Sequence, residues 1–133
     1  MNYVFDASAL IAYLRNEPGA ESVEGLLKDT ENSCQVHGLN LCEVYYDFLR
    51  SADEATAENV TQGLIGIGLS ICEDMDEAFW KEVARLKARH RISLADCCCL
   101  ALARRVGAEV VTTDHHEFDP LVQANLCPIL FIR

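Results

Sequence analysis

Four acidic residues stand at corresponding places in a chain whose strands and helices alternate: Asp6, Glu43, Asp96 and Asp114. Asp6 and Asp114 each directly follow a short run typical of a buried strand. Glu43 and Asp96 lie just inside the starts of two segments with helical periodicity. In a parallel sheet, the carboxyl ends of strands and the amino ends of the following helices share one rim, where such folds bind ligands. We therefore expect these carboxylates to converge on one small volume.

Such a cluster is electrostatically costly unless something neutralises it. Two carboxylates about 6 Å apart repel by roughly 3 kcal/mol at an effective dielectric of about 20. Summed over all pairs of four such groups, the cost is on the order of 10–20 kcal/mol, comparable to the stability of a whole domain. Helix amino ends offset only about 0.3–1 kcal/mol each. Protons or a divalent cation must resolve the repulsion, and an all-oxygen ligand set favours Mg²⁺ or Mn²⁺ over zinc or copper.

Each acid also has a purely structural interpretation. The spacings Asn40-x-x-Glu43 and Ser93-x-x-Asp96 match a capping box, in which the acid bonds back to the N–H of the cap residue. The two acids that follow strands also fit as ordinary turn residues. What favours the metal site is the conjunction, because four independent cap or turn acids need not fall on the same rim.

The elements that must position these acids follow from hydrophobic periodicity and from cap and turn residues. Strands are predicted at 2–6, 33–37, 69–73, 109–113 and 128–132. Helices are predicted at 9–16 after the cap Ser8, and at 20–29, 39–51, 54–67, 76–90 and 93–106, the last ended by Gly107. This alternation predicts an α/β fold with a parallel sheet covered on both faces. Neither a glycine-rich dinucleotide turn nor a P-loop follows the first strand, so nucleotide binding of those kinds is unsupported.

Size and composition fit a single domain over residues 1–133. Half of the residues are hydrophobic, which favours a compact core over disorder. No run approaches the ~18 to 20 apolar residues of a membrane span, and no secretory leader opens the sequence, so we expect a cytoplasmic protein without a membrane partner. The seven cysteines are odd in number and three are consecutive, which matches no zinc or disulfide pattern, so we expect reduced, buried packing residues.

The net charge of −10 counts against a protein that simply coats nucleic acid. It does not exclude an enzyme that holds phosphates through a bound cation and a local basic patch. Lys81, Arg85 and Arg89 follow at i, i+4 and i+8 and so share one helix face. This face is a candidate for binding substrate phosphates; the alternative is a solvated face around apolar Val83 and Leu86.

Four segments together carry a resemblance to a known family: Val4-Phe5-Asp6-Ala7-Ser8, Leu41-Cys42-Glu43-Val44, Ser93-Leu94-Ala95-Asp96 and Val111-Thr112-Thr113-Asp114. In order and spacing they resemble the motifs of PIN-domain nucleases, and in length and layout VapC-type toxins of toxin–antitoxin pairs. The resemblance implies a five-stranded parallel sheet of order 3-2-1-4-5 flanked by helices. It also implies an Mg²⁺- or Mn²⁺-dependent endoribonuclease that a cognate antitoxin neutralises.

The resemblance also implies roles for single residues. The four acids match the catalytic metal ligands of the family. Ser8 matches a small hydroxyl residue that contacts a metal-bound water or a phosphate. Glu117 and Asp119 are candidates for a further carboxylate, and His115 and His116 are either solvated loop residues or a general base.

Two other functions remain open at this point. The first is a non-catalytic interaction domain of the same fold that binds a partner through its acidic pocket, which the net charge favours. The second is a phosphoryl-transfer domain with Asp6 as nucleophile, weakened because Ser8 replaces a second acid two residues on. If the toxin resemblance holds, the apolar residues in 39–68 supply a groove for an antitoxin helix or a homodimer contact.

Overall fold

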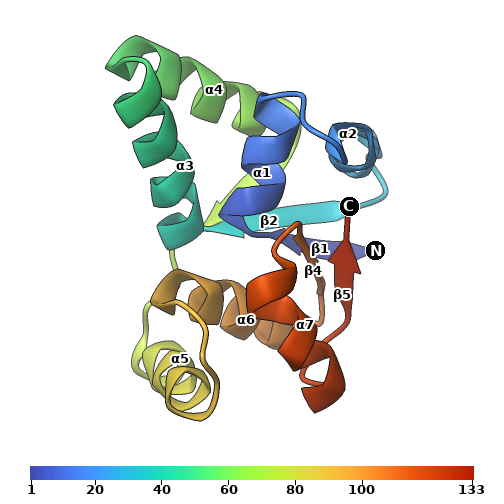
Figure 1. The fold of residues 1–133 in the computed structure, drawn as a ribbon, viewed down its shortest axis with the longest axis vertical. Coiled ribbons are helices and arrows are strands. Elements are labelled where there is room, and N and C mark those ends of the chain that lie inside the picture. Colours follow the sequence, from blue (N-terminus) through green and yellow to red (C-terminus); the bar gives the residue numbers. More distant parts are fainter.

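The computed structural model describes residues 1–133 and shows strands alternating with helices (Figure 1). The strands are β1 (Asn2–Phe5), β2 (Ser33–His37), β3 (Leu69–Cys72), β4 (Glu109–Thr112) and β5 (Ile129–Phe131). The helices are α1 (Ala7–Leu14), α2 (Ala20–Lys28), α3 (Gly38–Ser51), α4 (Glu54–Gly66), α5 (Glu77–Arg89), α6 (Leu94–Val106) and α7 (His115–Ala124). All strand pairs are parallel, in the order β3-β2-β1-β4-β5, which confirms the expected topology.

Helices cover both faces of the sheet and bury two separate apolar cores. Successive side chains of a strand point to opposite faces, so Val4 and Phe5 of β1 enter different cores. Val4 packs with residues of α5, α6 and α7, and Phe5 packs with residues of α1 to α4. Figure 1 shows these two groups of helices on opposite sides of β2. This arrangement leaves the rim at the strand carboxyl ends as the place for a site. No helix is both long and apolar enough to cross a bilayer.

The first helix begins earlier than the sequence suggested. Its cap is Asp6, whose Oδ1 accepts a hydrogen bond from the N–H of Ala9 at 2.9 Å, so Ser8 lies inside the helix and the prediction of Ser8 as cap is wrong. The reason is that β1 runs directly into α1, and an aspartate in extended conformation caps as well as a serine.

The sequence interpretation missed α7 altogether. Asp114 is its cap, and Oδ1 of Asp114 accepts from the N–H of Glu117 at 3.0 Å. His115 and His116 therefore belong to the first turn of a helix and not to a loop. Pro120 lies inside α7 and lacks an N–H to continue the ladder, which weakens the helical signal of a segment this short.

The cysteines behave mostly as packing residues. All seven are free, and Cys34 and the three consecutive residues 97–99 are buried. Burial raises the pKa of Cys97 and of Cys98 to about 11, which disfavours the thiolate form that a metal would need. Cys42 is exposed, so the expectation of a buried residue is wrong there.

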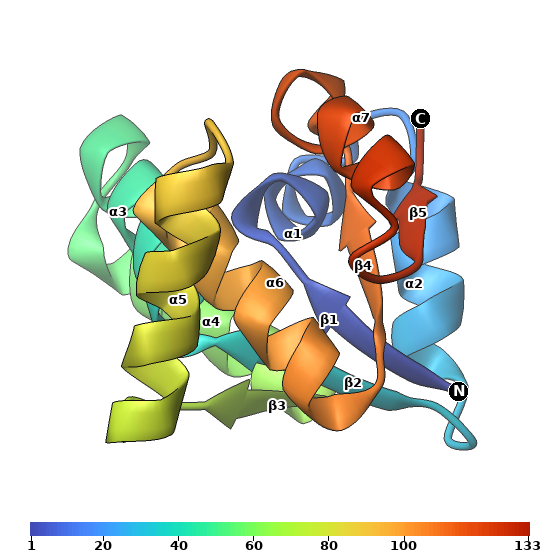
Figure 2. The same ribbon diagram turned by 90° about the horizontal axis from the view of Figure 1, so that it is seen from below.

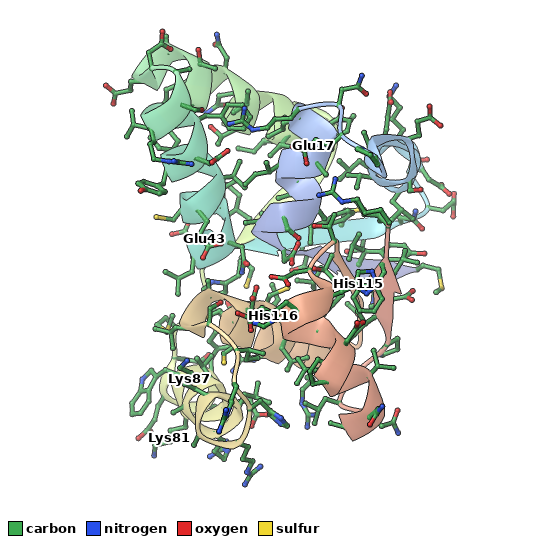
Figure 3. The ribbon with its side chains drawn as sticks, in the orientation of Figure 1. Glu17, Glu43, Lys81, Lys87, His115 and His116 are labelled. Atoms are coloured by element: carbon green, nitrogen blue, oxygen red, sulfur yellow. The ribbon has the colours of Figure 1, made fainter.

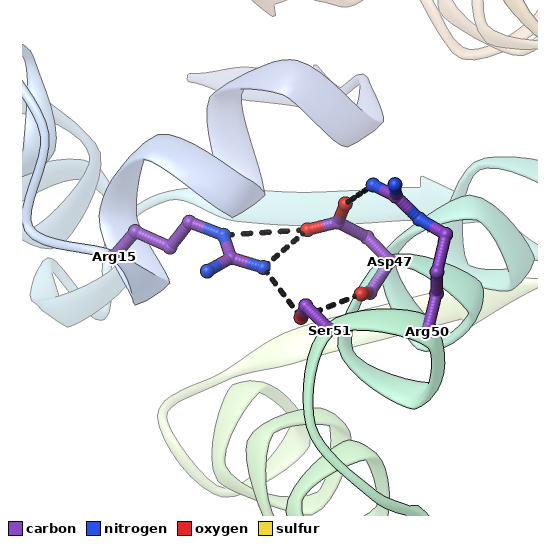
Figure 4. A network of polar contacts seen from close by, with 4 residues as sticks. All are labelled: Arg15, Asp47, Arg50 and Ser51. Carbon is purple, nitrogen blue, oxygen red and sulfur yellow. Dashed lines mark hydrogen bonds and ion pairs between the residues drawn. The ribbon is translucent and has the colours of Figure 1, made fainter.

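One polar network ties α1, which Asp6 caps, to α3, which contains Glu43 (Figure 4). The Arg15 guanidinium donates to Oδ2 of Asp47 at 2.7 Å and to Oγ of Ser51 at 2.9 Å. Arg50 donates to the other oxygen of Asp47 at 3.0 Å. Arg15 also lies over the ring of Phe48, 4.5 Å from its centroid. Hydrogen bonds from Arg15 in particular hold the pKa of Asp47 below its ordinary value.

We expect Asp47→Ala to lower the free energy of unfolding at neutral pH by on the order of 1 kcal/mol, because the network is partly exposed and only part of its Coulomb energy survives screening. Since the folded-state pKa of Asp47 is depressed, its contribution is present above the ordinary pKa of 3.8 and disappears as the pH falls through the folded-state value. Urea denaturation of both proteins as a function of pH measures this. A difference that persists unchanged in acid contradicts the prediction.

Candidate metal centre

The four acids identified from the sequence lie on one rim of the molecule. Asp6 and Asp114 cap α1 and α7, which begin where β1 and β4 end (Figure 2). Asp96 lies in the first turn of α6, and Glu43 in the first half of α3. Each interacts electrostatically with at least one other acid, because charges of Asp6 and Glu43 raise the pKa of Asp96 and that of Asp114 raises the pKa of Asp6. The structure thus brings the predicted set together.

The tightest group contains a residue that the sequence left undecided. One carboxylate oxygen each from Asp96, Asp114 and Glu117 lie within 4.8 Å of one another. Asp119, the other candidate for a further carboxylate, points elsewhere: its Oδ1 lies 2.8 Å from Nδ1 of His115. Because a helix places residues three apart on one face, Asp114 as cap and Glu117 one turn later both reach the α6 start.

Asp6 is the most enclosed of these acids, with 2% of its surface exposed. Oδ1 accepts from the N–H of Ala9 and, at 2.8 Å, from the hydroxyl of Ser8. Oδ2 accepts from the hydroxyl of Thr112. Burial nevertheless raises the pKa of Asp6 to about 6, with a smaller contribution from Asp114, because three hydrogen bonds do not replace full hydration. Such an enclosed, fully engaged carboxylate is poorly placed for attack as a nucleophile.

Thr112 is the functional residue that the sequence interpretation missed. This buried threonine ends β4, and its Oγ1 accepts the N–H of Asp114 at 2.9 Å while it donates to Asp6. One hydroxyl therefore fixes the positions of two acids from neighbouring strands. The available signal was a hydroxyl residue two positions before an aspartate at a strand end, a spacing typical of a side-chain turn.

Ser8 holds the same region in place. Its hydroxyl donates to Asp6 and accepts the N–H of Thr113 at 3.1 Å, across 105 residues of sequence. Both functions of the hydroxyl are therefore used within the protein. Contact of Ser8 with a metal-bound water or a phosphate stays a prediction, whereas its positioning of Asp6 is directly visible.

Asp96 has a carboxylate that its helix cap does not use. Its N–H donates to Oγ of Ser93 at 3.1 Å, so Ser93 is the helix cap, but no bond from the Ser93 N–H returns to the carboxylate. With 9% of Asp96 exposed, burial raises its pKa to about 7; the charges of Asp6, Glu117 and Glu43 act in the same direction. The full capping box expected as an alternative is therefore absent.

Glu43 also has no capping role. The cap of α3 is His37, whose Nδ1 accepts the N–H of Leu39 at 3.1 Å, so the capping-box interpretation of Asn40 and Glu43 is wrong. Asn40 is fully buried and donates through Nδ2 to the carbonyl of Ala95 at 3.1 Å, which ties α3 to the residue before Asp96. Glu43 lies near the start of α3, exposed on the rim (Figure 3), and partial burial raises the pKa of its carboxyl.

The donor set fits a hard divalent cation. All candidate ligand atoms are carboxylate oxygens, the ligands that Mg²⁺ and Mn²⁺ prefer. Oε2 of Glu117 is buried without any hydrogen-bond partner, an expensive state for a carboxylate oxygen. Glu117 cannot return to its own helix cap, because the N–H of Asp114 is already given to Thr112. A cation bound among these oxygens would satisfy Glu117 and offset the burial and the repulsion that raise the pKa of Asp96.

His115, a candidate general base, is occupied away from the acids. Its Nδ1 contacts Asp119, its Nε2 lies 2.8 Å from the carbonyl of Arg133, and its ring stacks on Phe131 at 4.1 Å. The Arg133 carbonyl, followed by Asp119, raises the pKa of His115. His116 is exposed beside α6 and α7 (Figure 3).

The predicted basic face divides into two parts. Lys81 pairs with Glu77 at 2.9 Å and Arg85 with Glu82 at 3.3 Å, both within α5. Arg89, at the end of α5, has no carboxylate partner and lines a cavity that Glu117 also lines. Substrate binding by these three cations stays a prediction.

Comparison with known proteins agrees with the fold. The sequence model of the PIN domain family matches residues 3–120 of this chain. No functionally curated protein matches the sequence. Among solved structures, VapBC2 from Rickettsia felis, bound to a DNA fragment from its promoter, gives a TM-score of 0.75 at 16% identity and covers 98% of each chain. DNA-bound VapBC from Salmonella typhimurium gives 0.75 at 16% identity, covering 100% of this chain and 99% of that one.

A third structure is Mycobacterium tuberculosis VapC20, described as a sarcin–ricin loop cleaving toxin. It gives a TM-score of 0.70 at 13% identity over 89% of this chain and 94% of that one. At such identities the likeness is one of fold. The family match spans most of the sequence and includes all four predicted acids, and the chain accordingly belongs to the PIN domain family, with the fold seen in VapC-type toxins.

Proposed function

We propose that this protein is a metal-dependent endoribonuclease and the toxin of a toxin–antitoxin pair. The observation that carries the proposal is the convergence of Asp96, Asp114 and Glu117 within 4.8 Å, with Asp6 and Glu43 close enough to shift the pKa of Asp96. VapC20, which shares the fold, is described as a toxin that cleaves the sarcin–ricin loop, and this supports RNA as the substrate class.

The acids divide the work by their surroundings. Asp96, Asp114 and Glu117 offer oxygens to Mg²⁺ or Mn²⁺, which supplies Lewis-acid polarisation of water and of the phosphate. Asp6 is buried beside these acids and is held by three hydrogen bonds. Glu43 is exposed, and its carboxylate is open to solvent and to a substrate strand. A carboxylate of the cluster, that of Asp96 or of Asp114, would take the proton from the attacking water.

A non-catalytic interaction domain remains the second candidate, favoured by the net charge of −10. It predicts that the acids bind cationic groups of a partner and that no phosphodiester is cut. The buried, unpartnered Oε2 of Glu117 favours the nuclease, because a protein side chain would reach this atom less readily than an ion.

Two protein partners belong to the proposal: a cognate antitoxin and a second copy of the chain. A groove between α3 and α4, about 290 Å³ in volume, is lined by Leu41, Tyr45, Ile65 and Ile71 among others. Its exposed apolar side chains suit an amphipathic helix of an antitoxin. Two of the solved structures with this fold are VapBC assemblies, which belong to a family of toxin–antitoxin systems, and this supports such a partner.

The proposal predicts loss of RNA cleavage in Asp96→Asn. The variant keeps size and shape but removes a ligand charge, so we expect kcat/KM in Mg²⁺ or Mn²⁺ to fall by at least about a hundredfold. Cleavage of single-stranded RNA is the assay, circular dichroism verifies folding, and Glu21→Gln, an exposed acid on α2, is the charge control. Undiminished cleavage by a folded Asp96→Asn protein would remove the mechanism.

A second prediction concerns the protein without metal. The pKa values of Asp6 (about 6) and Asp96 (about 7) lie above the ordinary 3.8, so the folded state holds more protons than the unfolded state between these limits. Their contribution to stability is therefore complete in acid and lost as the pH rises through about 7. We expect the melting temperature of the wild type in EDTA to fall more between about pH 5 and about pH 8 than that of Asp96→Asn, by about 3 °C or more.

Addition of Mg²⁺ or Mn²⁺ at about pH 8 should raise the melting temperature of the wild type more than that of Asp96→Asn, because only the wild type retains the full ligand set. Differential scanning calorimetry with and without metal measures both effects. Equal pH profiles for the two proteins would show that the pKa of Asp96 is not raised in the folded state.

A third prediction isolates Glu117. Glu117→Gln keeps a side chain of the same length but removes the charge that the cluster offers, so we expect affinity for Mn²⁺ to fall at least about tenfold. Isothermal titration calorimetry measures this without RNA, again with Glu21→Gln as control. Unchanged affinity for Mn²⁺ would exclude Glu117 as a metal ligand. It would not exclude the other acids.

A further inference from the structure

Most of the positively charged side chains of this acidic protein form ion pairs with carboxylates, and the few that do not lie close together in the sequence. The chain has eleven lysines and arginines, and most of them contact a carboxylate. The paired cations are Arg15, Lys28, Arg50, Lys81, Arg85, Arg104, Arg105 and Arg133. The unpaired ones are Lys87, Arg89 and Arg91, which all fall in one short stretch at the end of α5 and in the connection to α6.

This stretch has a defined backbone. His90 ends α5 in extended conformation, with φ −131° and ψ 146°. Nζ of Lys87 donates to the carbonyl of Ile92 at 2.7 Å and so closes the connection back onto the helix. Ile92 is buried in the core. The cations of Arg89, the last residue of α5, and of Arg91 in the connection are exposed and have no hydrogen-bond partner in the protein.

The loop lies directly beside the acidic centre. A cavity of about 290 Å³ is lined on one side by Arg89, His90 and Arg91 and on the other by Glu117 and Pro120. Figure 2 shows the loop between α5 and α6 rising to the same edge as α7. Glu117 is therefore the wall shared by the proposed metal centre and this cationic cavity. The volume lies just below the ~300–1,000 Å³ of pockets that enclose whole small molecules, which suits one charged group of a passing chain.

A purely structural role explains only part of this arrangement. Lys87 and Arg89 lie in the last turn of α5, where cations stabilise the helix dipole by about 0.3–1 kcal/mol. Arg91 lies beyond the helix end and gains nothing from the dipole. The chain has 21 acidic residues and eight of its cations pair with one, whereas Arg89 and Arg91 remain free to bind a ligand outside the protein.

We infer that Arg89 and Arg91 bind a backbone phosphate of the RNA strand that flanks the cleaved bond. The inference rests on the proposed ribonuclease function and adds a second anion site to it. An RNA strand meets repulsion from a protein of net charge −10, and the metal neutralises only the phosphate at which it acts. Arginine presents a planar fork that fits phosphate oxygens, and the backbone that carries both arginines is already anchored by the end of α5 and by the Lys87 contact. The adjacent phosphate is thereby held while the acids act on its neighbour.

The test is the double variant Arg89→Ala/Arg91→Ala. A contact to a flanking phosphate is made equally before and during the reaction, so KM should rise by roughly tenfold while kcat stays unchanged. A fluorescein-labelled, random-sequence single-stranded RNA, bound in EDTA so that it is not cut, gives a second measure by anisotropy over a salt series. The slope of log affinity against log salt should fall by about 0.7, since each neutralised phosphate of a single strand contributes about 0.7.

Lys28→Ala/Arg50→Ala is the matched control, because it removes two exposed cations that have carboxylate partners. It should keep the KM and the salt slope of the wild type. If the wild type cleaves RNA and the loop variant shows the KM and slope of this control, the inference is wrong and the nuclease stands. If the wild type neither binds nor cleaves RNA, the proposed function fails and the phosphate site with it. If the loop variant keeps RNA binding but loses binding of polyglutamate, the loop contacts a protein, and the inference is likewise overturned.

Discussion

The burial of carboxylates close to one another is the constraint on which the rest of this structure depends. Burial raises the pKa of Asp6 to about 6 and that of Asp96 to about 7, which means that the folded protein without metal resists carrying the charges it gathers. A chain selected only for stability would have no reason to bring these acids to one rim. Stability of this kind is given up only where a ligand returns it, because an ion that binds the folded state alone shifts the folding equilibrium in its favour.

The rest of the fold supplies the rigidity that holds the repelling groups in place. A parallel sheet with a core on each face brings the carboxyl ends of β1 and β4 side by side, through pairs such as Val4 with Val110. Thr112 then joins Asp6 to the backbone of Asp114, and Asn40 joins α3 to α6 beside Asp96. These polar contacts are buried, so losing one leaves a donor or acceptor without water to replace it. Moving the groups that hold the acids to any other position would therefore cost free energy.

How far the sequence predicted this arrangement depends on the range of the signals. Strand and helix periodicity are local, so β2 was found with its observed bounds and every helix except α7 was found with ends displaced by a residue or two. Local sequence could not decide whether Asp6 or Ser8 caps the first helix. The hydroxyl of Ser8 accepts a hydrogen bond from the N–H of Thr113, which is 105 residues away. Thr112, Asn40 and Glu117 act through partners distant in sequence or through the missed helix, and no periodic pattern marks such residues. The conjunction of four acids was visible because each ended or began a predictable element; the residues that hold them were not.

On the proposed function, the negative charge of the whole chain has a consequence for selectivity. A basic ribonuclease would bind any RNA through long-range attraction, and its affinity would depend weakly on where the strand lies. Here eight of eleven cations are neutralised by neighbouring acids, so attraction is confined to the metal and to the loop of Arg89 and Arg91. Repulsion elsewhere penalises every strand that does not engage both places, and like-charge juxtaposition of this kind discriminates by raising the energy of wrong complexes. An acidic surface is thus compatible with a nucleic-acid substrate when two local cationic sites determine where the strand binds.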